Sequence, residues 1–166
     1  MELICNSKTS LYCILGNPVS HCNSPIIHNL AFHKTGINSV FLSFVCDHGN
    51  IRQVFESIRT LGIKGGSITM PVKLDAMQYM DSIADDARLI GSINVFKNEN
   101  GVLTGYNTDG LGVVRFLQHK KISFKTKVVV AGAGGAGQSI AIQMALHGVK
   151  TLVICDKNLS AAQALG

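Results

Sequence analysis

The sequence lacks tryptophan, has only 3 prolines among 166 residues, and carries charge on only 15% of its side chains. No run approaches the roughly 18 unbroken apolar residues of a membrane-spanning helix. The N-terminal segment 1–10 also lacks the basic flank and apolar stretch of a secretion signal. With 46% apolar residues and 17 glycines, the composition is typical of a globular α/β chain with a packed core. We therefore expect a cytoplasmic protein with no membrane span.

The cysteines and histidines also exclude some classes of site. The 5 cysteines are an odd number without C-x-x-C spacing, which favours reduced thiols over a disulfide framework. The 6 histidines show no ligand spacing with one another or with the cysteines. The sequence therefore predicts no metal site.

The net charge of +5 suits anionic ligands such as nucleotide phosphates or small carboxylates. The densest basic stretch, residues 120–127, contains a single aromatic residue, Phe124, and so lacks a platform on which bases could stack. We interpret this stretch as a linker, and we expect a small-molecule ligand and no nucleic acid.

Strand and helix patterns alternate along the first part of the chain, which is typical of an α/β fold. The Ser24-Pro25 pair indicates a helix start, with the Ser24 hydroxyl as the expected cap. Strands are expected at 10–15, 40–45, 66–70, 92–97 and 102–106, and helices at 24–32, 51–61, 72–80, 85–90 and 109–118. The Asn100-Gly101 pair favours a tight hairpin turn between the last two strands. A domain boundary is expected in the basic stretch after residue 120.

A glycine-rich segment follows that boundary. Gly132, Gly134 and Gly137 match G-x-G-x-x-G between a strand expected at 128–131 and a helix expected at 138–147. The first glycine permits the turn, the second lets the backbone approach a pyrophosphate, and the third allows close packing of helix and strand. With Gly135 and Ala136, this turn is predicted to hold dinucleotide phosphates at a helix N-terminus. A merely structural turn is the alternative.

The end of the next strand, expected at 151–155, bears on the choice of cofactor. Asp156 stands where an acidic residue would bind the ribose hydroxyls and disfavour a 2′-phosphate, which favours NAD. Lys157 follows at once and could pair with that phosphate, which favours NADP. The cofactor is therefore predicted as NADP or NAD. Because two strands leave the sheet of a doubly wound fold incomplete, we expect this chain to be the front portion of a longer protein.

Polar residues gather in three segments where expected strands or turns end, at 20–25, 69–73 and 105–110. Ligands of parallel α/β sheets bind at such ends. Lys73 and Asp109 are candidates for chemistry there, although each has an ordinary explanation, as a surface lysine and as an acid in the first turn of a helix. From the residues alone, the prediction goes no further than an oxidoreductase.

Several motifs in order resemble the shikimate dehydrogenase family, including its quinate/shikimate members, over nearly the whole chain. They are residues 16–21 (GNPVSH), 24–29 (SPIIHN), 68–73 (ITMPVK), 91–94 (GSIN), 105–110 (GYNTDG) and the glycine turn. The resemblance implies an N-terminal α/β substrate-binding domain, residues 1–120, followed by the start of a Rossmann-type doubly wound nucleotide-binding domain, residues 121–166.

The resemblance also implies roles for individual residues. Lys73 and Asp109 would be the catalytic pair, and Ser24, Thr69 and Asn94 would contact the substrate, as would position 22, a serine in most of the family and Cys22 here. The implied reaction is the NAD(P)-dependent, reversible oxidation of shikimate to 3-dehydroshikimate, in aromatic amino-acid biosynthesis.

Two departures and a missing part keep alternatives open. Cys22 is a weaker donor than serine, and Asp156-Lys157-Asn158 stands where the family usually has Asn-Arg-Thr. The C-terminal part of the family normally supplies a glutamine to the substrate, so we expect this fragment alone to be inactive. A quinate dehydrogenase and a non-catalytic dinucleotide-binding regulatory protein are the alternatives, and the oligomeric state, a homodimer included, is left open.

Overall fold

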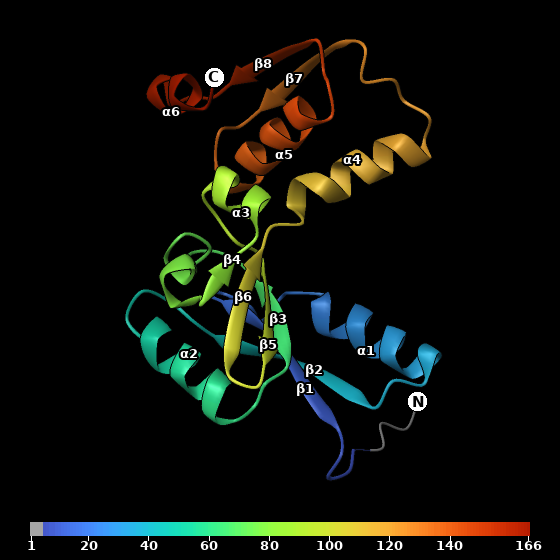
Figure 1. Cartoon of the computed structure of the whole chain (residues 1–166), viewed down its shortest axis with the longest axis vertical. Helices are drawn as coiled ribbons and strands as arrows, with labels where there is room; N and C mark the ends of the chain where they lie inside the picture. The colour runs from blue at the N-terminus through green and yellow to red at the C-terminus, as the bar shows by residue number, and fades with distance from the viewer. Residues whose placement is uncertain (1–4) are drawn as a thin grey trace. The chain divides into compact units, whose positions relative to one another are not determined.

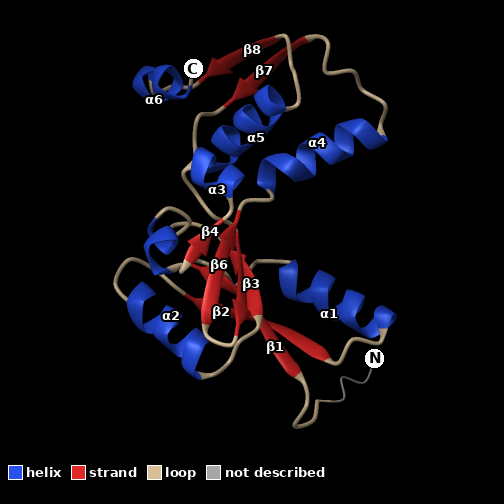
Figure 2. Cartoon of the chain, viewed as in Figure 1, coloured by secondary structure: helices blue, strands red, loops and turns tan. Residues whose placement is uncertain are grey.

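The computed structural model describes residues 5–166, which form two compact units. The first unit comprises the described residues up to Ala84 together with Ile93–Tyr106, and the second comprises Asp85–Ser92 together with Asn107–Gly166. The helices and strands of both are labelled in Figure 1 and coloured by type in Figure 2. The expected α/β class is confirmed.

A six-stranded sheet forms the centre of the first unit, in the order β2-β1-β3-β5-β6-β4. Strands β1, β2 and β3 run parallel, β5 is antiparallel to its neighbours β3 and β6, and β4 is parallel to β6. The bounds are Ser10–Gly16 (β1), Ser39–Val45 (β2), Gly65–Ile68 (β3), Ser82–Ile83 (β4), Val95–Glu99 (β5) and Val102–Tyr106 (β6). The sheet is mixed because β5, the first strand of the β5–β6 hairpin, runs antiparallel to the other strands.

Helices α1 (Ser24–Thr35) and α2 (Ile51–Thr60) lie on opposite faces of this sheet (Figure 1). On the α1 side, the Asn29 side chain donates to the carbonyl of Phe41 at 2.9 Å and accepts from its amide at 2.8 Å. On the other side, the helical repeat of apolar residues predicts one buried face made of Ile51, Val54, Phe55, Ile58 and Leu61. The helix buries Ile51, Phe55 and Ile58, but Leu61 follows its last residue and is 73% exposed.

The core of the first unit is built around aromatic rings. Phe55 stacks on Tyr79 at a centroid distance of 5.4 Å and meets Phe96 edge to face at 5.9 Å. Offset stacking and edge-to-face contact are the arrangements that aromatic rings prefer. This cluster joins α2 to the hairpin strand β5.

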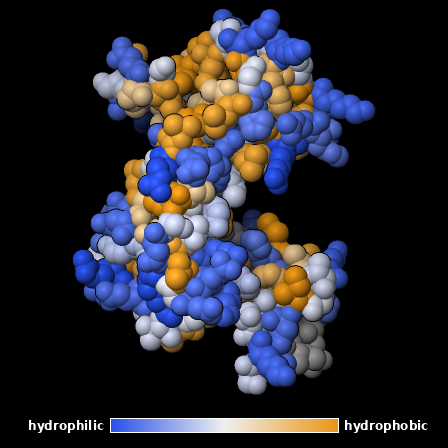
Figure 3. Space-filling view, in the orientation of Figure 1, coloured by the Kyte–Doolittle hydropathy of each residue, from blue (hydrophilic) through white to orange (hydrophobic). Residues whose placement is uncertain are grey.

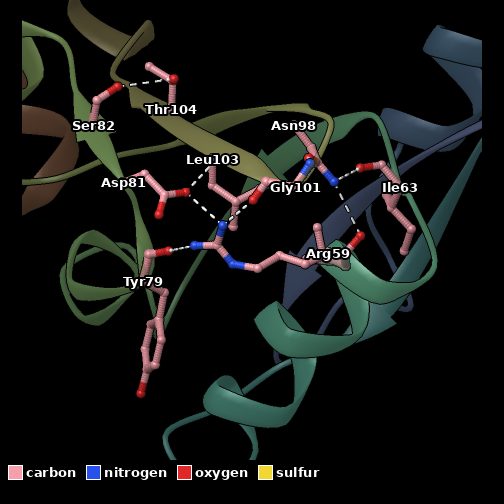
Figure 4. A network of polar contacts seen from close by, with 10 residues as sticks. Arg59, Ile63, Tyr79, Asp81, Ser82, Asn98, Gly101, Leu103 and Thr104 are labelled. Atoms are coloured by element: carbon pink, nitrogen blue, oxygen red, sulfur yellow. Dashed lines mark hydrogen bonds and ion pairs between the residues drawn. The ribbon is translucent and has the colours of Figure 1, made fainter.

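A polar network holds the segment before β4 against the hairpin (Figure 4). The Arg59 guanidinium donates to the Asp81 carboxylate at 2.6 Å, to the carbonyl of Tyr79 at 2.8 Å and to the carbonyl of Gly101. Asp81 also accepts from the amide of Leu103 at 2.6 Å. These bonds, Arg59 first, hold the pKa of the Asp81 carboxyl below its ordinary value.

The hairpin turn has the predicted geometry. Asn100 and Gly101 both have positive φ, +56° and +91°, as a two-residue hairpin turn of the left-handed type requires. The buried Asn98 side chain accepts from the amide of Gly101 at 2.9 Å and donates to the carbonyls of Ile58 and Ile63. The turn is thereby attached to the segment that follows α2.

Two local expectations were wrong. The helix expected at 72–80 is a turn followed by a short 3₁₀ helix, η1 (Asp75–Tyr79), because the carbonyl of Lys73 accepts from the amide of Ile93 at 3.2 Å and not from its own helix. Ser24 does not cap α1: the helix begins at Ser24 itself, and no side-chain cap bond is made at its N-terminus. Strand β4 was not predicted, since two residues give no pattern.

In the second unit, the parallel strands β7 and β8 pair from Lys127↔Thr151 to Ala131↔Cys155. Its elements are α3 (Asp85–Ile90), α4 (Asp109–His119), β7 (Lys127–Ala131), α5 (Gly135–Leu146), β8 (Thr151–Cys155) and α6 (Leu159–Leu165). Hydrophobic surface lies over the region of α5 and β7 (Figure 3), where Val129 is 59% and Leu146 58% exposed.

The compact units do not divide at the boundary expected after residue 120. Helix α4 belongs to the second unit, because its first turn packs so closely on α5 that a Cβ at Gly110 would lie 2.2 Å from the carbonyl oxygen of Ser139. The basic stretch is a loop between α4 and β7, as predicted, but it lies inside the second unit.

Candidate active site

The predicted substrate-binding residues of the first unit lie at one edge of its sheet. Strands β1 and β3 end at this edge, and β5 begins there because it runs antiparallel to β3. Cys22 and Ser24 follow β1, Thr69 and Lys73 follow β3, and Asn94 directly precedes β5. The carboxyl ends of parallel strands are where α/β sheets bind ligands.

The ends of β1 and β3 are in direct contact at this edge. A Cβ on Gly16 would lie 2.3 Å from Cγ2 of Thr69 and 2.7 Å from the carbonyl oxygen of Met70, so only glycine fits. The amide of Asn17 donates to that same carbonyl at 3.0 Å, and the amide of Thr69 donates to the carbonyl of Leu15 at 2.8 Å. The backbone around Thr69 is therefore held from both sides.

Lys73 and Asn94 are brought to the same edge by backbone bonds. The amide of Ile93 donates to the carbonyl of the half-buried Lys73. Asn94 is the residue after Ile93, so this bond brings the backbone of Asn94 close to that of Lys73. Asn94, only 9% exposed, accepts through its carbonyl from the amide of Ile68 at 2.7 Å and donates its own amide to Tyr106 at 2.9 Å. The backbone segments that carry Lys73 and Asn94 are thus neighbours at the end of β3.

Cys22 has an apolar environment. Its amide donates to the carbonyl of Val19 at 3.1 Å, and its side chain packs against the cluster of Ile14, Val19 and Phe41. Part of what this residue contributes is therefore packing, which a thiol suits better than a hydroxyl does.

The glycine turn of the second unit lies between β7 and α5. Gly132 has φ of +108°, a conformation that side chains rarely adopt, and a Cβ on Gly137 would lie 1.8 Å from the carbonyl oxygen of Gly132. The turn therefore needs glycine at its first and last positions, as expected of the motif.

The same turn fits the phosphates of a dinucleotide. Apart from the adjoining residues and the backbone of α5 itself, no atom of the described residues lies within 4 Å of the place where a Cβ on Gly134 or Gly135 would stand, so the backbone is open there. Helix α5 has 12 residues and begins at Gly135 with no side-chain cap on its N-terminus. Its first-turn amides and its macrodipole favour an anion at this open place.

Asp156 has a structural task that sequence reasoning missed. Its carboxylate accepts from the amide of Ala133 at 2.6 Å and from the amide of Asn158 at 2.7 Å. These bonds, that of Ala133 first, lower the pKa of the Asp156 carboxyl, so it stays charged. The residue attaches the glycine turn to the end of β8, while Lys157 beside it is exposed.

Asp109 is the first residue of α4, and its amide donates to Oδ1 of Asn107 at 3.2 Å. It belongs to the second unit, whereas Lys73 belongs to the first, so their pairing stays a prediction. Sequence reasoning overlooked the buried Asn107 and its neighbour Ser139. No local pattern marked Ser139, because α5 also contains the polar residues Gln138 and Gln143.

Within the described residues 5–166, no helix is long and apolar enough to cross a membrane. In that same part of the chain, no three His, Cys, Asp or Glu side chains gather as metal ligands would.

Comparisons with known proteins identify the family that the chain is similar to. The sequence family described as "Shikimate dehydrogenase substrate binding domain" matches residues 14–96. Shikimate dehydrogenase (NADP(+)) of Alkaliphilus metalliredigens is 42% identical over 166 residues, covering 99% of this chain and 58% of that protein. Its counterpart in Methanocaldococcus jannaschii is 38% identical over 161 residues, covering 96% of this chain and 56% of that protein. The chain therefore spans less than two thirds of the length of these relatives.

Solved structures are similar over the same region. Shikimate 5-dehydrogenase from Listeria monocytogenes, in complex with shikimate and NAD, has a TM-score of 0.94 at 32% identity, covering 99% of this chain and 58% of that one. The enzyme from Thermus thermophilus, in complex with NADP(H) and shikimate, has a TM-score of 0.89 at 27% identity, covering 95% and 59%.

Proposed function

This chain belongs to the shikimate dehydrogenase family, and on that premise we propose that the protein catalyses the reversible, NAD(P)-dependent oxidation of shikimate to 3-dehydroshikimate in aromatic amino-acid biosynthesis. The observation that carries the proposal is the open glycine turn at the start of α5, in a chain whose first sheet gathers Thr69, Lys73 and Asn94 at one edge. The glycine turn would bind a dinucleotide, and the residues at the edge of the sheet would bind a small polyhydroxy acid.

We assign the substrate to the first compact unit and the dinucleotide to the second, which includes α3 and α4 as well as the domain expected from residue 121. Ser24, Thr69 and Asn94 hold the hydroxyl and carboxylate groups of the substrate, and Cys22 closes that site on its apolar side. The cofactor contacts are assigned to the turn residues Gly132, Gly134, Gly135, Ala136 and Gly137, with Asp156 and Lys157 beside the ribose. A cytoplasmic location and a homodimer remain predictions.

The chemistry assigned to the first unit is proton transfer. The nicotinamide supplies the acceptor for the hydride that leaves the alcohol carbon. Lys73 takes the proton of that hydroxyl during oxidation and, as a cation, stabilises the developing alkoxide during reduction. Asp109 supports the charged form of Lys73 in this scheme.

NADP is the favoured cofactor, for two reasons. The relatives are named for NADP(+), and the Asp156 carboxylate already accepts two backbone amides. The exposed Lys157 is then available for a 2′-phosphate. NAD is the alternative, since the Listeria structure contains it.

Oxidation of shikimate or quinate by the complete protein, each with NADP+ and NAD+, tests the proposal. We expect the highest kcat/KM with shikimate and NADP+. A preference for quinate would support the second candidate, which the thiol of Cys22 favours. No oxidation of either substrate with either cofactor would refute the enzyme assignment and leave a dinucleotide-binding regulatory protein.

Lys73→Ala tests the assigned mechanism directly. We expect kcat to fall by about 10²- to 10⁴-fold, because the proton acceptor is lost. Lys97→Ala is the matched control, since Lys97 is 54% exposed and pairs with Glu99 on β5. Equal activity of the Lys73 variant and the control would exclude Lys73 as the base.

A further inference from the structure

A chain of buried hydrogen bonds surrounds Asn107, two residues before the start of α4. Asn107 is 2% exposed, and both Ser92 and Ser139 are fully buried. The Asn107 amide nitrogen donates to the carbonyl oxygen of Ser92 at 3.0 Å and to its hydroxyl at 3.1 Å. Its Oδ1 accepts from the hydroxyl of Ser139 at 2.7 Å and from the amide of Asp109 at 3.2 Å. The side-chain amide of Asn107 is thus fully used inside the second unit.

Ser139 connects this chain of bonds to α5. Its hydroxyl donates to Asn107 and accepts from the amide of Gly110 at 2.8 Å. The two helices meet here at backbone distance, because a Cβ on Gly110 would lie 2.2 Å from the carbonyl oxygen of Ser139. The Ser139 hydroxyl therefore holds two amides in the first turn of α4. It bonds directly to the amide of Gly110, and it holds the amide of Asp109 through the Asn107 side chain.

The same helix carries the glycine turn. Helix α5 begins at Gly135, so Ser139 lies one helical turn beyond the amides that favour a phosphate. Asp109 and the cofactor-binding turn are consequently joined by three rigid links: Asn107, Ser139 and the first turn of α5.

A buried polar network can simply specify a fold. The structure offers a comparison that separates this role from a catalytic one. Gln143, 3% exposed, lies one turn after Ser139 on α5, but it donates to the carboxylate of Asp86 on α3 at 3.2 Å. Both side chains pack against the first turn of α4, since a Cβ on Gly110 would also lie 2.9 Å from Cγ of Gln143. They differ in their hydrogen bonds: the Ser139 hydroxyl bonds to Asn107 and Gly110, whereas the Gln143 amide bonds to Asp86.

We propose that Asn107 and Ser139 are positioning residues, which hold Asp109 at a set place relative to the cofactor phosphates so that the two move as one body. This inference rests on the proposed function, because it takes Asp109 as the partner of the base and the glycine turn as the cofactor site. Small displacements of such a group are costly to the rate, because the reacting atoms must be aligned.

Ser139→Ala and the milder Ser139→Cys in the complete protein form the first test. We expect kcat to fall by about tenfold or more in the alanine variant and by less in the cysteine variant, with Michaelis constants for substrate and cofactor near the wild-type values. Gln143→Met is the matched control and should keep kcat near wild type. Equal losses in the Ser139 and Gln143 variants would overturn the proposal in favour of general packing.

The Asp109→Asn background provides a sharper kinetic test. If Ser139 acts through Asp109, Ser139→Ala should lower kcat little further once the carboxylate is gone. The same fold loss in both backgrounds would show that Ser139 acts independently of Asp109, and the proposal would be wrong.

Hydrogen exchange gives a readout that does not depend on turnover. NADP+, or NAD+ if only that binds, should slow exchange of the Asp109 and Gly110 amides in the wild type and in Gln143→Met, but not in Ser139→Ala. Failure to oxidise shikimate would refute the proposed function while this test still decides the positioning role. No protection of these two amides in the wild type would refute the positioning role itself.

Discussion

Phe55 and Phe96, each 1% exposed, fill the interior of the first unit, whereas the buried helix layer of the second unit contains Ser92, Asn107 and Ser139. Burial of apolar side chains contributes most of the stability of a fold, but it does not depend on the orientation of the groups that are buried. Hydrogen bonds between buried groups add less net stability, but they are costly when misaligned. Both units bury apolar side chains, such as Val114 and Met144 in the second, but the second adds hydrogen bonds that define the geometry of the first turn of α4. Substitutions in each unit can test this contrast.

The largest expected effect is on the aromatic core of the first unit. Phe96→Ala should lower the free energy of unfolding of the complete protein by about 3–5 kcal/mol, because it removes a ring and leaves a cavity. Phe116→Ala is the matched control, since that ring is 58% exposed, and it should cost no more than about 0.5 kcal/mol. Denaturant unfolding measures both. Similar losses would mean that the first unit does not rely on its buried rings.

A smaller loss is expected at the glycine turn of the second unit. Gly137→Ala should cost about 1–3 kcal/mol and weaken dinucleotide binding, because its Cβ would overlap the carbonyl of Gly132. In Gly112→Ala, on α4, nothing lies within 4 Å of the new methyl group, so we expect stabilisation of about 0.5–1 kcal/mol. Thermal unfolding and cofactor titration measure the pair. A harmless Gly137 variant would contradict the close approach of α5 to the turn.

The smallest effect is expected at the ion pair of the first unit. Asp81→Asn should cost about 1 kcal/mol or less at neutral pH, because the pair with Arg59 is partly exposed, at 32% and 45% of the two side chains. Folding lowers the pKa of this carboxyl, so its contribution is complete above the unfolded value of about 3.9 and is lost as the pH falls through the folded value.

The difference in unfolding free energy between wild type and Asp81→Asn should therefore be constant from neutral pH to about 4 and shrink below it. Unfolding measured across this range checks the direction. A difference that grew on acidification would mean that the carboxyl is not stabilised in its charged form.

Regular patterns predicted most of the fold. The Asn100-Gly101 turn and most of the apolar face of α2 were predicted correctly because each depends on local chemistry alone, whereas Leu61 lies beyond the end of α2 and is exposed. The segment 72–80 was misread because a long-range bond, from Ile93 to Lys73, overrides its helical pattern. Helix α4 was placed in the wrong unit because its packing partner, α5, lies beyond the basic loop.

The candidate site was predictable in part for the same reason. The glycine turn is defined by the spacing of its own residues, so Gly132 and Gly137 could be identified from the sequence. Asp156 could be found but not its bond to Ala133, which depends on how the turn folds back on β8. Asn107 and Ser139 were missed because a bond between residues so far apart in sequence leaves no local pattern.

The short helix α3 has a consequence for how this protein can be recombined. The chain leaves the first unit at Ala84, returns at Ile93 and leaves again after Tyr106, so neither unit is one continuous stretch. No single crossover between related genes can exchange the second unit intact. A crossover after residue 106 exchanges the rest of the second unit but not α3. A crossover before residue 85 exchanges α3 but also the β5–β6 hairpin, which belongs to the first unit. Chimaeras of family members should therefore work only with α3 and α5 inherited from the same parent, because Gln143 of α5 donates to Asp86 of α3.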